Sequence, residues 1–162
     1  MKDFWRAALV LVLAMQAGIA AAQERALAGG AGFGGPLGAA VTGELVYGPG
    51  ADVRDDGERV RGVAGLLVQV HAGSGGGKVS LGVGGRARVD TEDFKGPLAA
   101  GLKLSLARTW GSPVGTRSGL TYLGPELDLS IKHVSLSLGP LFRVGGAGGG
   151  AVLFSWGLGV RF

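Results

Sequence analysis

The chain has 162 residues and no cysteine, so a single domain must hold together without disulfides, and a lipoprotein anchor is excluded. Sixteen basic and 12 acidic residues give a formal net charge of +4. The two signs are scattered and form no basic stripe, which argues against nucleic acid as a partner. The 34 glycines suit strands that bend tightly, because glycine leaves room for neighbouring side chains.

The first 22 residues are typical of a secretory signal peptide. Lys2 and Arg6 form the charged start, residues 7–14 the apolar run, and Ala20-Ala21-Ala22 the small residues that a signal peptidase accepts. We expect cleavage after Ala22, which leaves 14 basic and 11 acidic residues and a formal charge of +3. The apolar run is too short to span a membrane, and no later run approaches the roughly 20 residues of a spanning helix.

Alternation of apolar residues with small or polar ones predicts a series of strands, because side chains along a strand point to opposite faces. The clear segments are residues 37–48, 64–71, 79–89, 98–107, 123–131, 134–144 and 151–162. Residues 24–35 alternate more weakly and supply an eighth strand, which an even count requires. The repeat of about ten residues per strand predicts an all-β fold, an antiparallel up-and-down transmembrane β-barrel of eight strands over residues 23–162.

The connections between these strands raise two points. A charged polar loop is predicted at residues 49–61, on the same side as both chain ends, where connections in bacterial barrels are usually short. Folding the last two hairpin strands about the turn Lys132-His133 sets Pro125 opposite Pro140. Because each proline removes a ladder donor, we expect a local bulge or kink there.

The last strand indicates which kind of barrel this is. One of its faces is entirely apolar: Val152, Phe154, Trp156, Leu158, Val160 and Phe162. This ending resembles the C-terminal strand of bacterial outer-membrane β-barrels, whose terminal Phe is read by their insertion machinery. The resemblance implies that Phe162 is an insertion signal. It also implies a monomer in the outer membrane that contacts lipid and lipopolysaccharide, with its last strand contacting the barrel-assembly machinery.

The second face of each strand would then line the barrel interior. The charged residues expected there are Glu44, Arg86, Arg88, Lys103, Glu126, Asp128, Arg143 and Arg161, together with Gln69 and His71. An eight-stranded barrel is only wide enough for side chains to fill, so we expect these charges to pair and close the lumen rather than line a pore. The aromatic residues expected at the membrane interfaces are Tyr47, Trp110, Trp156 and Phe162.

Two other interpretations stay open. A soluble periplasmic barrel would also alternate, with its apolar face turned inward around an apolar ligand. The outer-membrane lipid A deacylases, themselves eight-stranded barrels, are similar in using a His-x-Ser pair with a carboxylate. That resemblance implies His133 as base, Ser135 as nucleophile, and Glu126 or Asp128 as the orienting acid. The family places Asn after its Ser, whereas Leu136 stands here.

The remaining motifs do not indicate chemistry. The G-x-G-x-x-G at residues 30–35 lacks the strand–helix context of a dinucleotide site. His71 and His133 are far apart and there is no Cys to complete a metal site, while the acidic residues of segment 52–58 lack EF-hand spacing. We therefore expect no cofactor and no metal. The expected role is non-enzymatic, either membrane-structural or in surface interaction.

Overall fold

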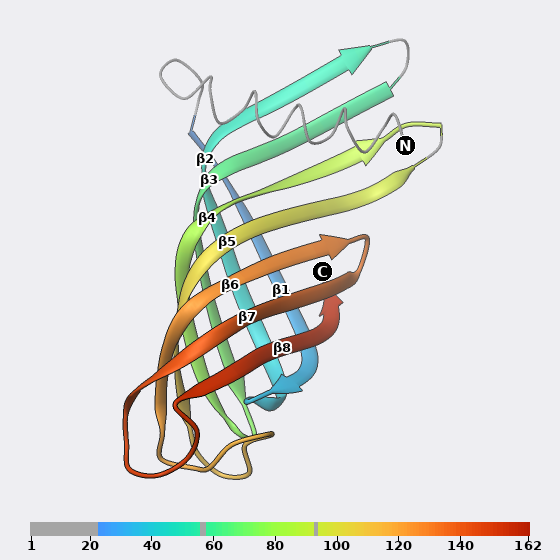
Figure 1. The fold of residues 1–162 in the computed structure, drawn as a ribbon. Helices are drawn as coiled ribbons and strands as arrows, with labels where there is room; N and C mark the ends of the chain where they lie inside the picture. The colour runs from blue at the N-terminus through green and yellow to red at the C-terminus, as the bar shows by residue number, and fades with distance from the viewer. Residues whose placement is uncertain (1–22, 56–57, 93) are drawn as a thin grey trace.

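The computed structural model describes residues 23–55, 58–92 and 94–162; the predicted signal peptide, residues 1–22, lies outside them. Eight antiparallel strands follow one another around a closed barrel, in which the last strand pairs with the first (Figure 1). The strands are β1 (Gln23–Gly35), β2 (Gly38–Asp55), β3 (Glu58–Gly73), β4 (Gly76–Asp90), β5 (Lys95–Thr109), β6 (Thr121–Ile131), β7 (Val134–Gly145) and β8 (Val152–Arg161). The predicted eight-stranded up-and-down arrangement is confirmed, including the weakly patterned first strand. The described residues contain no helix long and apolar enough to cross a membrane.

The register of the ladders fixes the tilt of the strands. Successive paired residues can be followed once around the ring, and the path returns to β1 ten residues from its start. It runs through Gly35, Trp156, Leu138, Leu127, Leu102, Val83, Leu66, Tyr47 and Arg25. With roughly 3.3 Å per residue and roughly 4.8 Å between strands, this stagger corresponds to a tilt of about 40°. The interior of such a barrel is filled by side chains.

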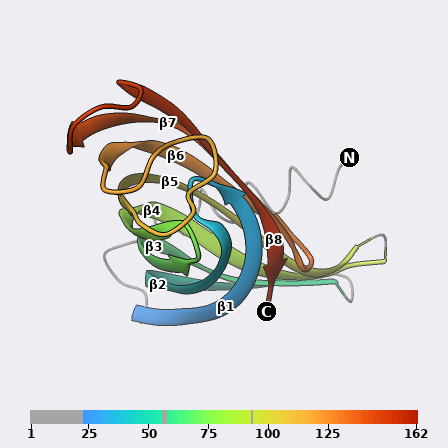
Figure 2. The same ribbon diagram turned by 90° about the horizontal axis from the view of Figure 1, so that it is seen from below.

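The two ends of the barrel differ. We call the end that carries the β5–β6 and β7–β8 connections the closed end, and the end that carries Gln23 and Phe162 the open end. Figure 2 looks at the ring from the closed end, where the long β5–β6 connection lies across it. An apolar cluster fills the interior there: Ala107, Leu120, Tyr122, Leu141 and Leu153. A second apolar cluster lies inside toward the open end and consists of Ala26, Val46, Val63 and Leu67.

The prediction of a polar loop at residues 49–61 is wrong for most of that segment. β2 continues to Asp55 and β3 starts at Glu58, and their ladder sets Asp52 opposite Arg61. Four of the charged residues, Asp52, Arg54, Arg59 and Arg61, share the inner face and alternate with apolar residues such as Val53 and Val60, so the segment keeps a strand pattern. With the β4–β5 hairpin, these strands project beyond β1 and β6–β8 (Figure 1). We call residues 49–55, 58–64, 85–90 and 95–99 the β2–β5 extension.

The two prolines interrupt the β6–β7 ladder, but the register does not shift at them, so the bulge expected there is absent. The register is the same on either side of the prolines, which sets Pro125 opposite Pro140. No residues are paired in the stretch that contains them, between the pairs Leu123–Phe142 and Leu127–Leu138. Neither proline has an N–H to donate, so the ladder cannot form there. The bulge lies a few residues away, between Thr121 and Tyr122 next to the β5–β6 connection.

The seam between β1 and β8 is the shortest ladder of the barrel. It pairs six residues, Gly30–Gly35 with Trp156–Arg161, whereas the β3–β4 ladder pairs 15. Apart from Arg161, glycines occupy the inner face of this seam, and a Cβ on Gly34 would lie 2.0 Å from the backbone oxygen of Trp156. Around Gly34 the two strands can therefore approach this closely only because no side chain stands between them.

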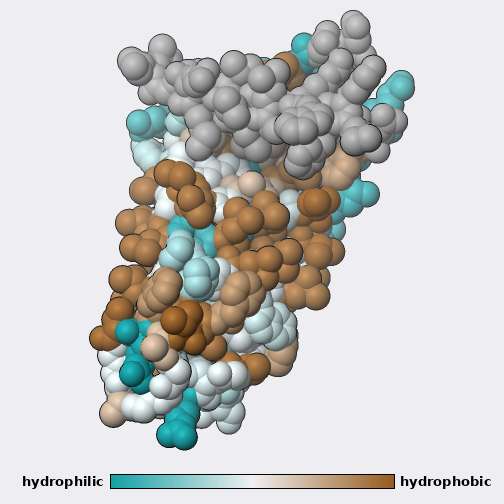
Figure 3. Space-filling view, viewed as in Figure 1, coloured by the Kyte–Doolittle hydropathy of each residue, from teal (hydrophilic) through white to brown (hydrophobic). Residues whose placement is uncertain are grey.

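The outer face of the barrel is apolar. Large apolar side chains that are 38 to 73% exposed occur on all eight strands. Figure 3 shows hydrophobic side chains across the middle of the visible face, with hydrophilic ones gathered at the lower tip. The polarity of the barrel is thus largely the reverse of that of a water-soluble domain, since many large apolar side chains are exposed on its outer face and its buried charges face inward.

Candidate functional site: a buried charge network

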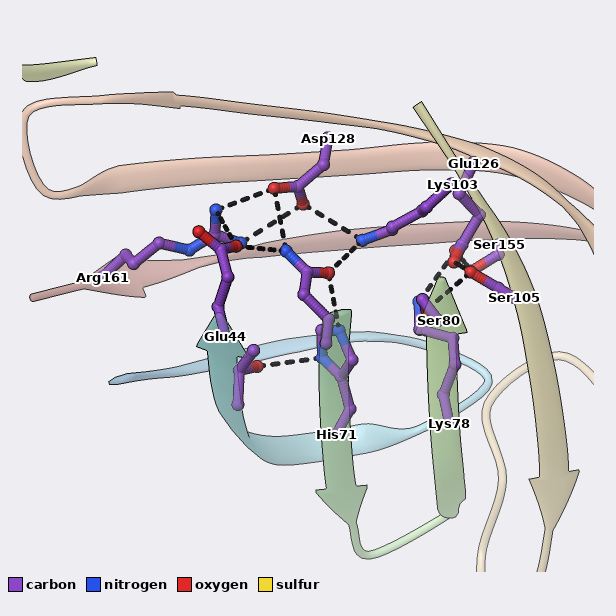
Figure 4. A network of polar contacts seen from close by, with 12 residues as sticks. Glu44, His71, Lys78, Ser80, Lys103, Ser105, Glu126, Asp128, Ser155 and Arg161 are labelled. Atoms are coloured by element: carbon purple, nitrogen blue, oxygen red, sulfur yellow. Dashed lines mark hydrogen bonds and ion pairs between the residues drawn. The ribbon is translucent and has the colours of Figure 1, made fainter. Parts of the chain in front are cut away.

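Polar side chains from six strands meet in the middle of the barrel (Figure 4). They come from the inward positions of β2, β3, β4, β5, β6 and β8: Thr42, Glu44, Gln69, His71, Lys78, Ser80, Lys103, Ser105, Glu126, Asp128, Ser155 and Arg161. The ladders bring them together, because Gln69 stands opposite both Glu44 and Ser80, and Lys103 stands opposite Glu126. Residues far apart in sequence therefore become cross-strand neighbours on one face.

Asp128 is the centre of one half of the network. The Arg161 guanidinium donates to both of its oxygens, from Nη1 to Oδ2 at 2.7 Å and from Nη2 to Oδ1 at 3.2 Å. Lys103 Nζ lies 3.3 Å from Asp128 Oδ1, and Arg161 also reaches Glu44 at 3.0 Å. Gln69 links the group, since its amide N–H donates to Glu44 and Asp128 while its oxygen accepts from Lys103.

Glu126 is the centre of the other half. Lys78 Nζ donates to Glu126 Oε1 at 2.8 Å, and Ser155 Oγ donates to the same oxygen at 2.6 Å. The second carboxylate oxygen accepts from Ser105, which lies 2.7 Å from the Ser80 hydroxyl. Every oxygen of this buried carboxylate therefore has a donor, which is what makes a buried charge tolerable.

The polar side chains of the network serve as hydrogen-bond and ion-pair partners for one another. The side chains of Lys78 and Glu126 are 3% and 0% exposed, and Arg86 adds a further ion pair with Glu44 at 3.0 Å. Among the described residues, no buried side-chain nitrogen or oxygen lacks a hydrogen-bond partner. Beside the network a cavity of about 60 Å³ reaches the β1–β8 seam. Such a space holds a few waters, and the side chains around it are arranged so that they can close the lumen.

Two of the charged residues expected inside take no part in this network. Arg88 is exposed on the β2–β5 extension. Arg143 lies at the closed end, where its guanidinium donates to the backbone oxygens of Gly148 and Gly149. Both are on an inward-facing parity, but they lie above and below the central cluster. Alternation assigns a residue to a face and does not give its depth.

One member of the network, Lys78, is not among the residues predicted from the sequence to lie inside the barrel. Lys78 follows a glycine-rich turn, and the strand was expected to start one residue later. It stands two residues before Ser80 and therefore shares its inward face, which is the signal that could have identified it. In the structure β4 begins at Gly76, so Lys78 lies inside the ladder, opposite His71.

The four aromatic residues expected at the interfaces lie toward the two ends of the barrel. Tyr47 and Phe162 are exposed near the open end, and Trp110 and Trp156 are exposed toward the closed end. The Trp156 ring meets Phe33 edge-on, with ring centroids 6.0 Å apart. The outer face therefore carries aromatic side chains near both of its borders.

The His-x-Ser pair is not assembled into a catalytic group. His133 Nδ1 lies 3.2 Å from the backbone oxygen of Arg161, and its ring lies beside Phe162. Within the described residues, no hydrogen bond joins His133 to Ser135, Glu126 or Asp128. Both of those carboxylates are occupied by the cations of the network. The described residues also contain no group of three or more His, Cys, Asp and Glu arranged to hold a metal.

Comparisons with protein-family models, with curated proteins and with solved structures found no match to this chain. Its function is therefore argued from the geometry of the barrel.

Proposed function

We propose that the protein is an outer-membrane β-barrel of a diderm bacterium, exported through a signal peptide that is cleaved after Ala22. Its role is membrane-structural or in surface interaction, without enzymatic activity. The observation that carries the proposal is the reversed polarity of the barrel. Among the described residues, 27 large apolar side chains face outward and are exposed, while charged side chains of both signs are buried inside. In water this surface would favour aggregation, whereas a bilayer would cover it.

The borders of the barrel support the same proposal. Exposed aromatic residues lie near both ends, as they do at the two interfaces of a membrane barrel. The connections at the closed end, residues 36–37, 74–75, 110–120 and 146–151, contain no Asp or Glu. Arg108, Arg117 and Arg143 lie in or next to them. A cationic rim without carboxylates suits the phosphate groups of lipopolysaccharide, which we propose as the surface that this end contacts.

The filled interior argues against a pore. An apolar cluster and a charge network lie one above the other in the lumen, so ions have no continuous water-filled path. We expect no stepwise conductance when the purified protein is added to a planar lipid bilayer. Reproducible single-channel steps would refute a closed lumen.

The proposal is tested by comparing the gel mobility of the membrane-extracted protein before and after boiling. A barrel stable in detergent migrates differently until it is boiled, and we expect such a shift, with the protein in the outer-membrane fraction. Deletion of Phe162 should lower the amount of folded protein in that fraction, because the terminal aromatic is the proposed assembly signal. Phe142→Ala is the matched control, since Phe142 is also exposed on the outer face but does not end the chain.

A different result would change the assignment. If the protein fractionates in the soluble periplasm without a mobility shift, the membrane proposal fails. An apolar ligand bound by a soluble barrel then becomes the leading function. If location and shift are as expected but Phe162 deletion has no effect, the barrel assignment stands and only the role of the terminal residue fails.

A further inference from the structure

A hollow of about 460 Å³ lies at the open end, between β1 and the β2–β5 extension. Ala26 and Val63 form part of its apolar lining, and they belong to the cluster that fills the lumen below it. Five arginines and two carboxylates line the rest: Arg25, Arg59, Arg61, Arg86, Arg88, Glu24 and Asp90. Its volume is within the range of sites for small organic ligands.

Three of these arginines are crowded on adjacent strands. Arg61 of β3 stands directly opposite Arg88 of β4, and Arg86 lies two residues earlier on the same face of β4. Directly opposed residues have their Cβ atoms roughly 5 Å apart, and like charges in that position destabilise a sheet. The β3–β4 ladder therefore holds a repulsive pair at the wall of the hollow.

The nearby carboxylates reach only one arginine of this pair, Arg61, which also stands opposite Asp52 of β2. Glu24 pairs with Arg61 at 3.3 Å, and Asp90 pairs with Lys95 at 3.6 Å. Arg86 pairs with the buried Glu44. Within the described residues, Arg88 has neither a hydrogen bond nor an ion pair.

Arg59 is also engaged. Its guanidinium donates to both oxygens of Asp52, at 3.0 and 2.6 Å. The hydrogen bond from Arg59 holds the pKa of that carboxyl below its usual value, so Asp52 stays ionised and keeps Arg59 occupied. Of the five arginines in the described lining, Arg88 and Arg25 are thus the two without an ion pair, and Arg88 is the one that stands opposite Arg61.

We propose that Arg88 and Arg61, supported by Arg86, bind the phosphate or carboxylate group of a small soluble organic anion in this hollow. Guanidinium groups present paired N–H donors that match both kinds of oxyanion, and an anion between the opposed arginines removes their repulsion. The apolar lining accommodates the body of the ligand. The site needs only the hollow and the β3–β4 ladder, so it does not depend on the membrane role proposed above.

The test uses the membrane-extracted protein in a neutral detergent. Phenyl phosphate and benzoate are titrated separately by calorimetry at constant ionic strength, and the probe that binds more tightly identifies the anionic group. Arg88→Gln should weaken that binding at least tenfold. Arg54→Gln is the matched control, because Arg54 lies on the same extension but outside the lining of the hollow, and it should leave the affinity unchanged.

A second variant distinguishes a loss of binding from a loss of folding. Arg88→Lys keeps the charge but loses the paired donors, so we expect intermediate affinity and an unaltered gel-mobility shift on boiling. Absence of saturable binding of either probe to the wild-type protein would overturn the proposal. Equal weakening by Arg54→Gln and Arg88→Gln would also overturn it, because that pattern means general charge attraction. A failed titration with an intact mobility shift leaves the barrel proposal untouched.

Discussion

Replacing Glu126 with Gln removes one buried charge while keeping the size of the side chain. In the wild-type protein this carboxylate accepts from Lys78 at 2.8 Å and from Ser155 at 2.6 Å. The variant leaves the ammonium group of Lys78 in a position that is 3% exposed, without its counterion. The change therefore probes directly whether the interior is closed to water.

The expected cost follows from this burial. Removing one partner of a buried ion pair costs about 3–5 kcal/mol, because the remaining charge stays desolvated. That cost lowers the folding equilibrium constant by roughly 10²–10⁴-fold. An exposed pair offers the comparison: Asp90 and Lys95 lie 3.6 Å apart and are 63% and 76% exposed. For Asp90→Asn we expect at most about 1 kcal/mol.

The assay is urea unfolding of the protein folded into lipid vesicles, followed by tryptophan fluorescence and by gel mobility. The double variant Lys78→Met/Glu126→Leu should recover most of the stability lost in Glu126→Gln. The reason is that replacing a buried pair by apolar side chains is often close to neutral. Recovery separates the effect of an unpaired charge from a general loss of packing.

One result would refute this reasoning. If Glu126→Gln and Asp90→Asn each cost less than about 1 kcal/mol, the interior solvates a lone ammonium group as well as bulk water does. The lumen would then be hydrated. The case against a conducting path would fail with it.

Three further predictions concern the wall of the barrel. Leu104→Arg, on the outer face of β5, should cost about 2–4 kcal/mol in the same unfolding assay; a cost near zero would mean that this face does not meet lipid. Gly34→Ala should reduce the boiling-sensitive folded band, because its Cβ would meet a backbone oxygen of β8 at 2.0 Å, while Gly43→Ala, with nothing within 4 Å, should leave the band unchanged. His133→Ala and Ser135→Ala should leave the mass spectrum of cellular lipid A unaltered, and a shift in acyl content caused by Ser135→Ala would restore the hydrolase hypothesis.

Much of the architecture could be predicted from the sequence, because alternation is a local property. The final strand shows six apolar residues in strict alternation, and even the glycine-rich first strand keeps the pattern. The hairpin at residues 49–61 was missed because charged residues and Pro49 suggested a loop. In the structure Arg59 of β3 donates hydrogen bonds to Asp52 of β2. This cross-strand partner is not apparent when the segment is considered alone, and its charged residues then suggest a turn.

The composition of the site could be predicted only in part, because depth inside a barrel depends on register. Arg86 and Arg88 are two residues apart on one face, yet Arg86 reaches the buried Glu44 while Arg88 lies exposed at the mouth. Which residues fall at the same height follows from the stagger of all eight ladders. The sequence of a single strand does not determine that stagger. The opposition of Arg61 and Arg88 at the open end therefore follows only from the structure of the whole barrel.

The six-residue seam between β1 and β8 also leads us to expect a particular order of assembly for the barrel. Joining these strands closes a loop of almost the entire described chain, which carries the largest entropy cost of any ladder, and it returns the fewest paired residues. The β2–β3 and β4–β5 hairpins close over short connections and return 14 and 15 pairs. We therefore expect folding to start from the long hairpins in the middle of the chain and to end at the seam. Until that last step both terminal strands would keep an unpaired edge, which we expect to need protection while the protein folds.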